Sequence, residues 1–227
     1  MSQIFQPRAN ILARSFLIAL CVAVLAGAVL VEALVLLPYV TLEGVVPKGT
    51  RVGLTPEQPV PFSHKHHVGD VGIDCRYCHT SVERSWFAGL PPTHTCMTCH
   101  SLFLDKVPML APLRASMTEE VPIQWVKVAN LPDYVYFNHS IHVAKGVGCE
   151  TCHGRVDKLP MMRQMYPFTM EFCLSCHRDP APYLRPRDEI FAMGWKPKGS
   201  PSGIGPRLMA EYRIDTRGLT NCSTCHR

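Results

Sequence analysis

Five copies of the pattern Cys-x-x-Cys-His carry most of the chemistry that this sequence offers. They lie at Cys75, Cys78 and His79; Cys96, Cys99 and His100; Cys149, Cys152 and His153; Cys173, Cys176 and His177; and Cys222, Cys225 and His226. The pattern is typical of covalent c-type haem attachment. Two cysteines form thioethers with the porphyrin, and the next histidine ligates the iron. We therefore predict five covalently bound c-type haems (heme c).

Zinc sites and thioredoxin-like redox pairs also use paired cysteines. Neither needs a histidine directly after every second cysteine, so the repeated motif argues against both. A disulfide framework is equally poor as an explanation, because ten of the eleven cysteines fall inside the five motifs.

The histidines outside the motifs are candidates for the second axial position of each iron. They are His64, His66, His67, His94, His139 and His142. Two His-x-x-His pairs stand at matching places before the first and third motifs, and we predict their members, His64, His67, His139 and His142, to be distal ligands. The two rings of one pair can serve different haems. His66 lies between two ligands and is expected to be a bystander.

The fifth haem has no obvious distal partner. Met170 and His94 occupy equivalent places before the fourth and second motifs, and we favour Met170. Met161, Met162 and Met165 are further candidates. With four or five distal positions filled from the chain, no iron is reserved for substrate. This favours electron transfer over catalysis at haem, so no catalytic residue is assigned.

The first four motifs form an internal repeat of a two-haem module, residues 62–100 and 137–177. His64 and His139 are 75 residues apart, and Cys75 and Cys149 are 74 apart. An approximate two-fold relation between the haem pairs is expected. Residues 178–227 form a fifth-haem segment, which completes a pentahaem domain over 62–227.

The composition predicts a multihaem cytochrome c fold of short helices and loops with little strand, packed around its haems. The chain has 227 residues with 20 prolines and 15 glycines, which supply turns. Residues 101–120 could form a helix broken at its prolines, 121–137 have an extended pattern, and 205–214 could form a short helix. The formal net charge is +5, which the propionates of bound haems would offset. No nucleic-acid partner is expected, because such a partner would need a clustered basic face and the haem propionates make the basic net charge misleading.

The N-terminal region predicts a membrane anchor. Residues 15–37 are apolar with Glu32 as their only charge, which is long enough to cross a bilayer. The alternative is a cleaved signal peptide, whose apolar region is usually shorter. We expect residues 1–14 in the cytoplasm, 38–61 as a linker, and the haem domain on the periplasmic side of a bacterial cytoplasmic membrane, since bacteria attach c-type haem outside that membrane.

Taken together, the apolar helix, the duplicated Phe-x-His-x-x-His plus two-motif unit and the fifth motif resemble the pentahaem cytochrome c subunits (ActA) of bacterial alternative complex III. The most specific stretches are FSHKHHVGDVGIDCRYCH, VYFNHSIHVAKGVGCETCHG and FTMEFCLSCHR. The resemblance implies an electron-relay subunit of a quinol:acceptor oxidoreductase. Its implied partners are a polytopic quinol-binding subunit, an iron-sulfur subunit, a monohaem cytochrome c and a downstream periplasmic carrier, oxidase or reaction centre.

Two other functional classes share parts of this pattern. A stand-alone, membrane-anchored multihaem quinol dehydrogenase of the NapC/NrfH type would also combine one helix with a multihaem domain, but it would bind quinol itself. A multihaem nitrite or hydroxylamine enzyme would need an iron with an open coordination position.

Overall fold

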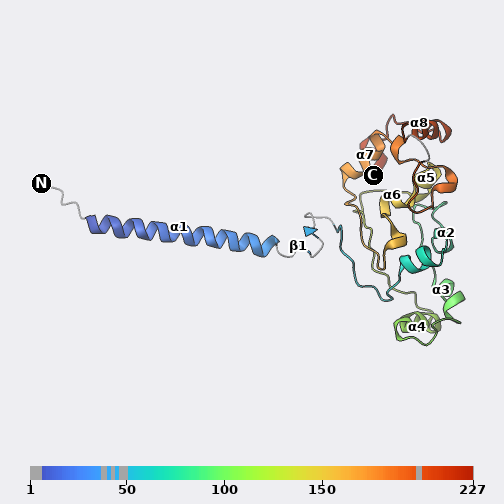
Figure 1. Ribbon diagram of the computed structural model, residues 1–227, viewed down its shortest axis with the longest axis horizontal. Helices are drawn as coiled ribbons and strands as arrows, with labels where there is room; N and C mark the ends of the chain where they lie inside the picture. The colour runs from blue at the N-terminus through green and yellow to red at the C-terminus, as the bar shows by residue number, and fades with distance from the viewer. Residues whose placement is uncertain (1–6, 37–39, 42–43, 46–50, 198–200, 227) are drawn as a thin grey trace. The chain divides into compact units, whose positions relative to one another are not determined.

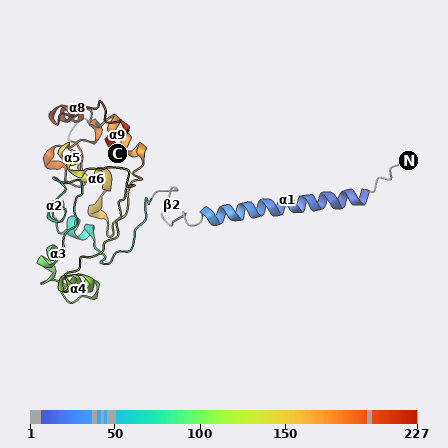
Figure 2. The same cartoon turned by 180° about the vertical axis from the view of Figure 1, so that it is seen from behind.

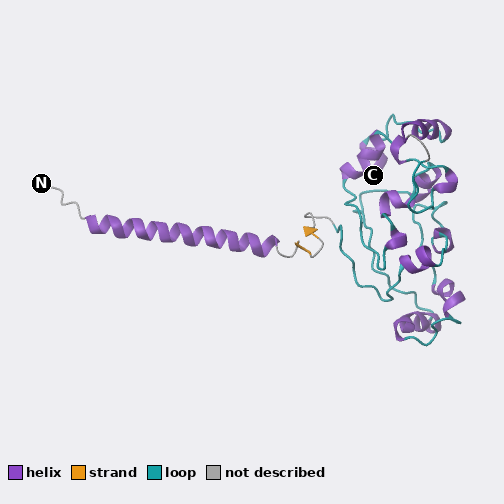
Figure 3. Ribbon diagram, in the orientation of Figure 1, coloured by secondary structure: helices purple, strands orange, loops and turns teal. Residues whose placement is uncertain are grey.

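The computed structural model describes residues 7–36, 40–41, 44–45, 51–197 and 201–226. The chain divides into two compact units, residues 1–50 and 51–227. Strand is confined, among the described residues, to β1 (Val40–Thr41) and β2 (Gly44–Val45), which pair antiparallel, and to isolated bridges (Figure 3). The expectation of little strand is confirmed.

The first unit contains α1 (Pro7–Leu36), a helix of 30 residues. At 1.5 Å per residue it is about 45 Å long. Its segment Ala13–Glu32 has a mean hydropathy of 2.5, and it is the one described helix long and apolar enough to cross a membrane. A single-pass membrane anchor fits this helix. Residues 1–6, Leu37 and much of the expected linker lie outside the described residues.

The second unit is built from short helical segments joined by loops (Figure 1). Its α-helices are α2 (Cys75–Cys78), α3 (Thr93–His100), α4 (Ala111–Glu119), α5 (His139–Ala144), α6 (Cys149–His153), α7 (Met170–Arg178), α8 (Pro201–Glu211) and α9 (Cys222–Cys225). A π-helical turn, η2 (Lys65–Asp70), and the 3-10 turns η3 (Pro108–Leu110), η4 (Val156–Lys158), η5 (Ala181–Tyr183) and η6 (Arg187–Glu189) complete it.

Two segments differ in detail from the expectation. In 101–120 the prolines begin helices instead of breaking one, because Pro108 opens η3 and Pro112 lies in the first turn of α4, where the missing N–H has no partner to lose. The C-terminal helix, α8, begins at Pro201 and ends at Glu211, and so starts before the expected 205–214. Residues 121–137 are largely irregular, with a single bridge from Val135 to His226.

The apolar core of the second unit consists of three small, separate clusters. Their buried members are Val60, Leu110 and Leu113; Val82, Val143 and Ile190; and Leu184, Leu208 and Tyr212. Figures 1 and 2 place α3 and α4 at one end of this unit and α7 and α8 at the other. The second haem motif packs against the first of these clusters through Cys96 and Met97.

Candidate haem sites

The two cysteines of every motif lie on one side of a short helix. The helices α2, α6 and α9 begin at the first cysteine of their motif, and the other two motifs fall within α3 and α7. Residues three apart on a helix share a face, so both sulfurs can reach one edge of a porphyrin. Side-chain caps fix some of these turns: Asp74 accepts a hydrogen bond of 2.8 Å from the Arg76 amide at the start of α2.

Four motif histidines each face one of the predicted distal histidines. The ring centres are 6.4 Å apart for His64 and His79, 6.1 Å for His67 and His100, 6.4 Å for His139 and His153, and 6.2 Å for His142 and His177. Both members of each His-x-x-His pair are used, and they face different motifs. The structure thus brings together the candidate ligands that the sequence left unpaired.

The separations of these rings suit an iron between two imidazoles. A metal–imidazole bond is about 2.0 Å long, so two such bonds and two ring radii give ring centres about 6 Å apart. In the pairs His64–His79 and His139–His153 the rings are also nearly parallel, at 2° and 5°. The residues present therefore fit haem iron with histidine on both sides.

Backbone carbonyls hold most of the ring nitrogens that point away from the iron positions. The Nδ1–H groups donate from His67 to Ser63 (2.9 Å), His79 to Gly89 (2.7 Å), His100 to Phe103 (3.2 Å), His139 to Trp86 (2.8 Å), His142 to Asn138 (2.7 Å), His177 to Leu219 (2.8 Å) and His226 to Tyr134 (3.1 Å). A proton on Nδ1 leaves the Nε2 lone pair free for a metal. Such hydrogen bonds orient a ligating ring and raise its basicity.

Burial keeps the remaining two rings neutral. Desolvation, followed by the influence of neighbouring histidines, lowers the pKa of His64 and of His153 to about 4. A neutral imidazole is the form that binds a metal. The Nδ1 atom of His64 is buried without a hydrogen-bond partner among the described residues, which is unusual for a polar atom.

The phenylalanine before each His-x-x-His pair packs against both of its rings. Phe62 meets His64 edge to face at 4.9 Å and stacks on His67 at 4.3 Å. Phe137 repeats both contacts, with His139 at 4.8 Å and His142 at 4.4 Å. The sequence showed the repeated Phe but gave it no role. The structure identifies these two residues as positioning residues for the distal ligands.

Phe137→Leu is expected to loosen both histidines of the second module. Loss of the ring contacts should destabilise the protein by about 1–3 kcal/mol and broaden the ferric electron-paramagnetic-resonance (EPR) signals of two haems. The matched control is Phe172→Leu, because the ring contacts of Phe172 are with Tyr166 and Phe168. Equal spectral broadening in both variants would show that Phe137 acts only as packing.

The predicted ligands outside the four pairs are less well determined. The ring next to His226 is Tyr134, at 5.8 Å. Met170 begins α7 with its side chain 65% exposed, and His94 is exposed in α3. His66 is also exposed, with its Nδ1 atom 3.7 Å from Asp70.

Met170 remains our prediction for the fifth distal ligand. It lies one helical turn before Cys173. Burial, followed by the charge of Cys225 in the fifth motif, raises the pKa of Cys173. If Met170 binds iron, the oxidised protein will show the weak far-red absorption band of histidine/methionine haem, and Met170→His will abolish it and lower one reduction potential. Met109→Leu, at another exposed methionine, should change neither. Absence of the band in the unmodified protein would contradict this assignment.

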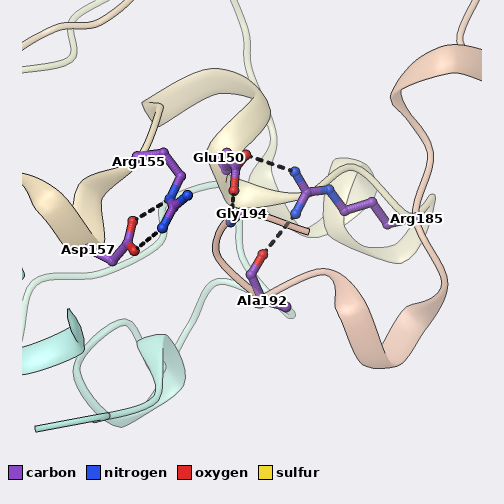
Figure 4. Close-up of polar contacts among 6 residues, drawn as sticks. All are labelled: Glu150, Arg155, Asp157, Arg185, Ala192 and Gly194. Carbon is purple, nitrogen blue, oxygen red and sulfur yellow. Dashed lines mark hydrogen bonds and ion pairs between the residues drawn. The ribbon is translucent and has the colours of Figure 1, made fainter. Parts of the chain in front are cut away.

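An ion pair between buried Arg185 and half-buried Glu150 ties the third motif to the segment before the fifth haem (Figure 4). The Glu150 carboxylate accepts a hydrogen bond from the Gly194 amide and lies 3.7 Å from the Arg185 guanidinium, which also donates to the Ala192 carbonyl at 2.9 Å. Arg185 is buried, so both partners are needed to offset its desolvation. Residues 185–194 are thereby fixed against α6.

Residues 135–227 match the protein family described as cytochrome c7 and related cytochrome c. The fold class is that of a multihaem cytochrome c. The chain is also similar to the "Menaquinone reductase, multiheme cytochrome c subunit" of Nitratidesulfovibrio vulgaris, with 36% identity over 126 residues. This match covers 55% of the chain and 53% of the relative, so the chain spans about half the length of that protein.

The family match covers the part of this multihaem cytochrome that holds its last three motifs. It begins two residues before Phe137 and so includes the complete second module and the fifth-haem segment. Covalently bound haem c is the cofactor of the chain. When bound, haem c supplies one-electron redox chemistry, and the motif cysteines and paired histidines described above would attach and ligate it.

Proposed function

We propose that this chain is the electron-transfer subunit of a membrane-bound, quinone-linked oxidoreductase, with five covalently bound haems c. The observation that carries the proposal is the set of four facing histidine pairs, at 6.1–6.4 Å. Two histidines on one iron leave no position for a substrate, which suits electron relay and disfavours catalysis at these four sites. The apolar helix α1 supports attachment to a membrane.

The finer proposal is a complex of the alternative complex III type. In it a polytopic subunit oxidises quinol, iron-sulfur and monohaem cytochrome subunits flank the relay, and a periplasmic carrier, oxidase or reaction centre accepts the electrons. The haem domain would lie on the periplasmic side of a bacterial cytoplasmic membrane. The repeated modules and the anchor support this assignment through the resemblance described above.

A second candidate reverses the direction of electron flow. The similar protein from Nitratidesulfovibrio vulgaris is named as a subunit of a menaquinone reductase. A relay of the same kind could therefore deliver electrons to a quinone instead of receiving them from a quinol. The chain's own part in the relay is the same in both cases.

Purification in mild detergent, followed by subunit identification and haem quantification, tests the proposal. We expect five haems per chain by intact mass and co-purification with a polytopic membrane subunit. Reduction by a quinol analogue or oxidation by a quinone analogue then gives the direction. A chain that purifies alone and oxidises quinol would contradict the relay and favour a NapC/NrfH-type quinol dehydrogenase.

A further inference from the structure

The two sites of the first module are direct neighbours. His64 and His67 stand three residues apart and face His79 and His100 respectively. The motifs themselves are in contact, because the hydroxyl of Tyr77 in the first is hydrogen bonded to Thr98 of the second at 3.0 Å. The site of His79 therefore adjoins the site of His100.

The second module repeats this arrangement. His139 and His142 face His153 and His177. These two distal histidines are three residues apart, on one turn of α5. The third and fourth motifs are thus adjacent in the same way as the first and second.

The modules meet through backbone hydrogen bonds beside their first distal histidines, which face His79 and His153. The Lys65 amide donates to the Leu159 carbonyl at 3.0 Å, and the amides of His139 and Ser140 donate to the carbonyls of Trp86 and Ser85, each at 3.2 Å. The bonds from Lys65 and Ser140 join equivalent positions of the repeat in opposite directions. The contact therefore joins the sites of His79 and His153.

The fifth-haem segment adjoins the fourth motif. His177 donates its Nδ1–H to the carbonyl of Leu219, three residues before the fifth motif, at 2.8 Å. At the other end, Cys96 and Met97 pack against the apolar cluster of Val60, Leu110 and Leu113.

We propose that the five haem-binding sites form one unbranched row in the order His100, His79, His153, His177, His226. The order differs from that in the sequence, because the second motif lies at one end and the fifth at the other. Figures 1 and 2 agree, since α3 and α7 lie toward opposite ends of the second unit. This inference rests on the proposed relay with its five haems, and it adds where such a relay begins and ends.

The test removes one end of the row and measures one chosen site at a time in the purified full-length chain. Cys222→Ser with Cys225→Ser removes the attachment of the fifth haem. His142→Met marks the site of His177, and His67→Met marks the site of His100, by the far-red band of a histidine/methionine haem. Every protein in this comparison also carries Met170→His, which abolishes the band expected of the fifth haem, so the midpoint potential of the remaining band reports the marked site alone.

The proposed order predicts that loss of the fifth haem shifts the midpoint potential of the site marked by His142→Met. It should leave the site marked by His67→Met unchanged within error, because interactions between charges decline with distance and screening. A shift at the His67→Met site equal to or larger than the other would overturn the order. If a methionine does not bind, His142→Ala and His67→Ala mark the same sites by a high-spin ferric signal. A wild-type chain with fewer than five haems would instead count against the proposed function.

Discussion

Replacing His67 by alanine is expected to convert one ferric haem per chain from low spin to high spin. His67 is held by Phe62 and by the Ser63 carbonyl, and its ring faces that of His100 at 6.1 Å. Without it, the iron bound by His100 keeps one imidazole and has a vacant or water-filled sixth position. EPR and visible spectra of the oxidised protein will show the new high-spin signal.

The neighbouring residue provides the control. His66→Ala removes an exposed ring that lies near Asp70 and meets the His67 ring edge to face at 5.4 Å. We expect all ferric signals to stay as in the unmodified protein. High-spin iron in both variants, or in neither, would contradict the assignment of His67 as a ligand.

Gly146→Ala is expected to destabilise the protein by about 2–5 kcal/mol, a large share of the stability of a typical domain. Gly146 has a φ of +81°, which disfavours any residue with a side chain. A Cβ atom there would also overlap the Tyr212 ring and lie 2.9 Å from the carbonyl oxygen of Arg185. The urea midpoint of the haem-loaded protein and the yield of fully loaded protein measure the effect.

The repeat offers a matched control at Gly72, the equivalent position of the first module. Its φ is +79°, but a Cβ atom there would meet nothing within 4 Å. Gly72→Ala should therefore cost only the backbone strain, on the order of 1 kcal/mol. The difference between the two variants isolates the clash with Tyr212 and Arg185. Equal losses would show that backbone strain alone accounts for both.

The sequence predicted the chemistry of the haem sites better than their arrangement. The motifs and the two His-x-x-His pairs could be found because attachment and ligation need fixed residue types at short, fixed spacing. Which distal histidine faces which motif could not be derived, because it depends on how loops bring segments together. The carbonyl that holds His139, for example, belongs to Trp86, 53 residues away.

Packing around the ligands was also outside the reach of sequence reasoning. Phe62 and Phe137 could be recognised as a residue repeated in both modules. Aromatic residues pack in many ways, however, and only the structure shows that each one contacts two histidine rings. The fifth distal ligand stays a prediction for a related reason. Met170 has no repeated partner pattern, so neither spacing nor symmetry constrains it.

The backbone contacts between the two modules have a consequence for the form of the haem domain. Lys65 donates to Leu159, and their counterparts Ser140 and Ser85 are bonded in the same way, which is the property of an isologous interface between two identical subunits. The two modules therefore stand to each other as the subunits of a homodimer do, within one chain. Such a core is the same from either end. The two ends of the domain differ through the unrepeated segments, residues 101–125 after the second motif and residues 178–221 before the fifth.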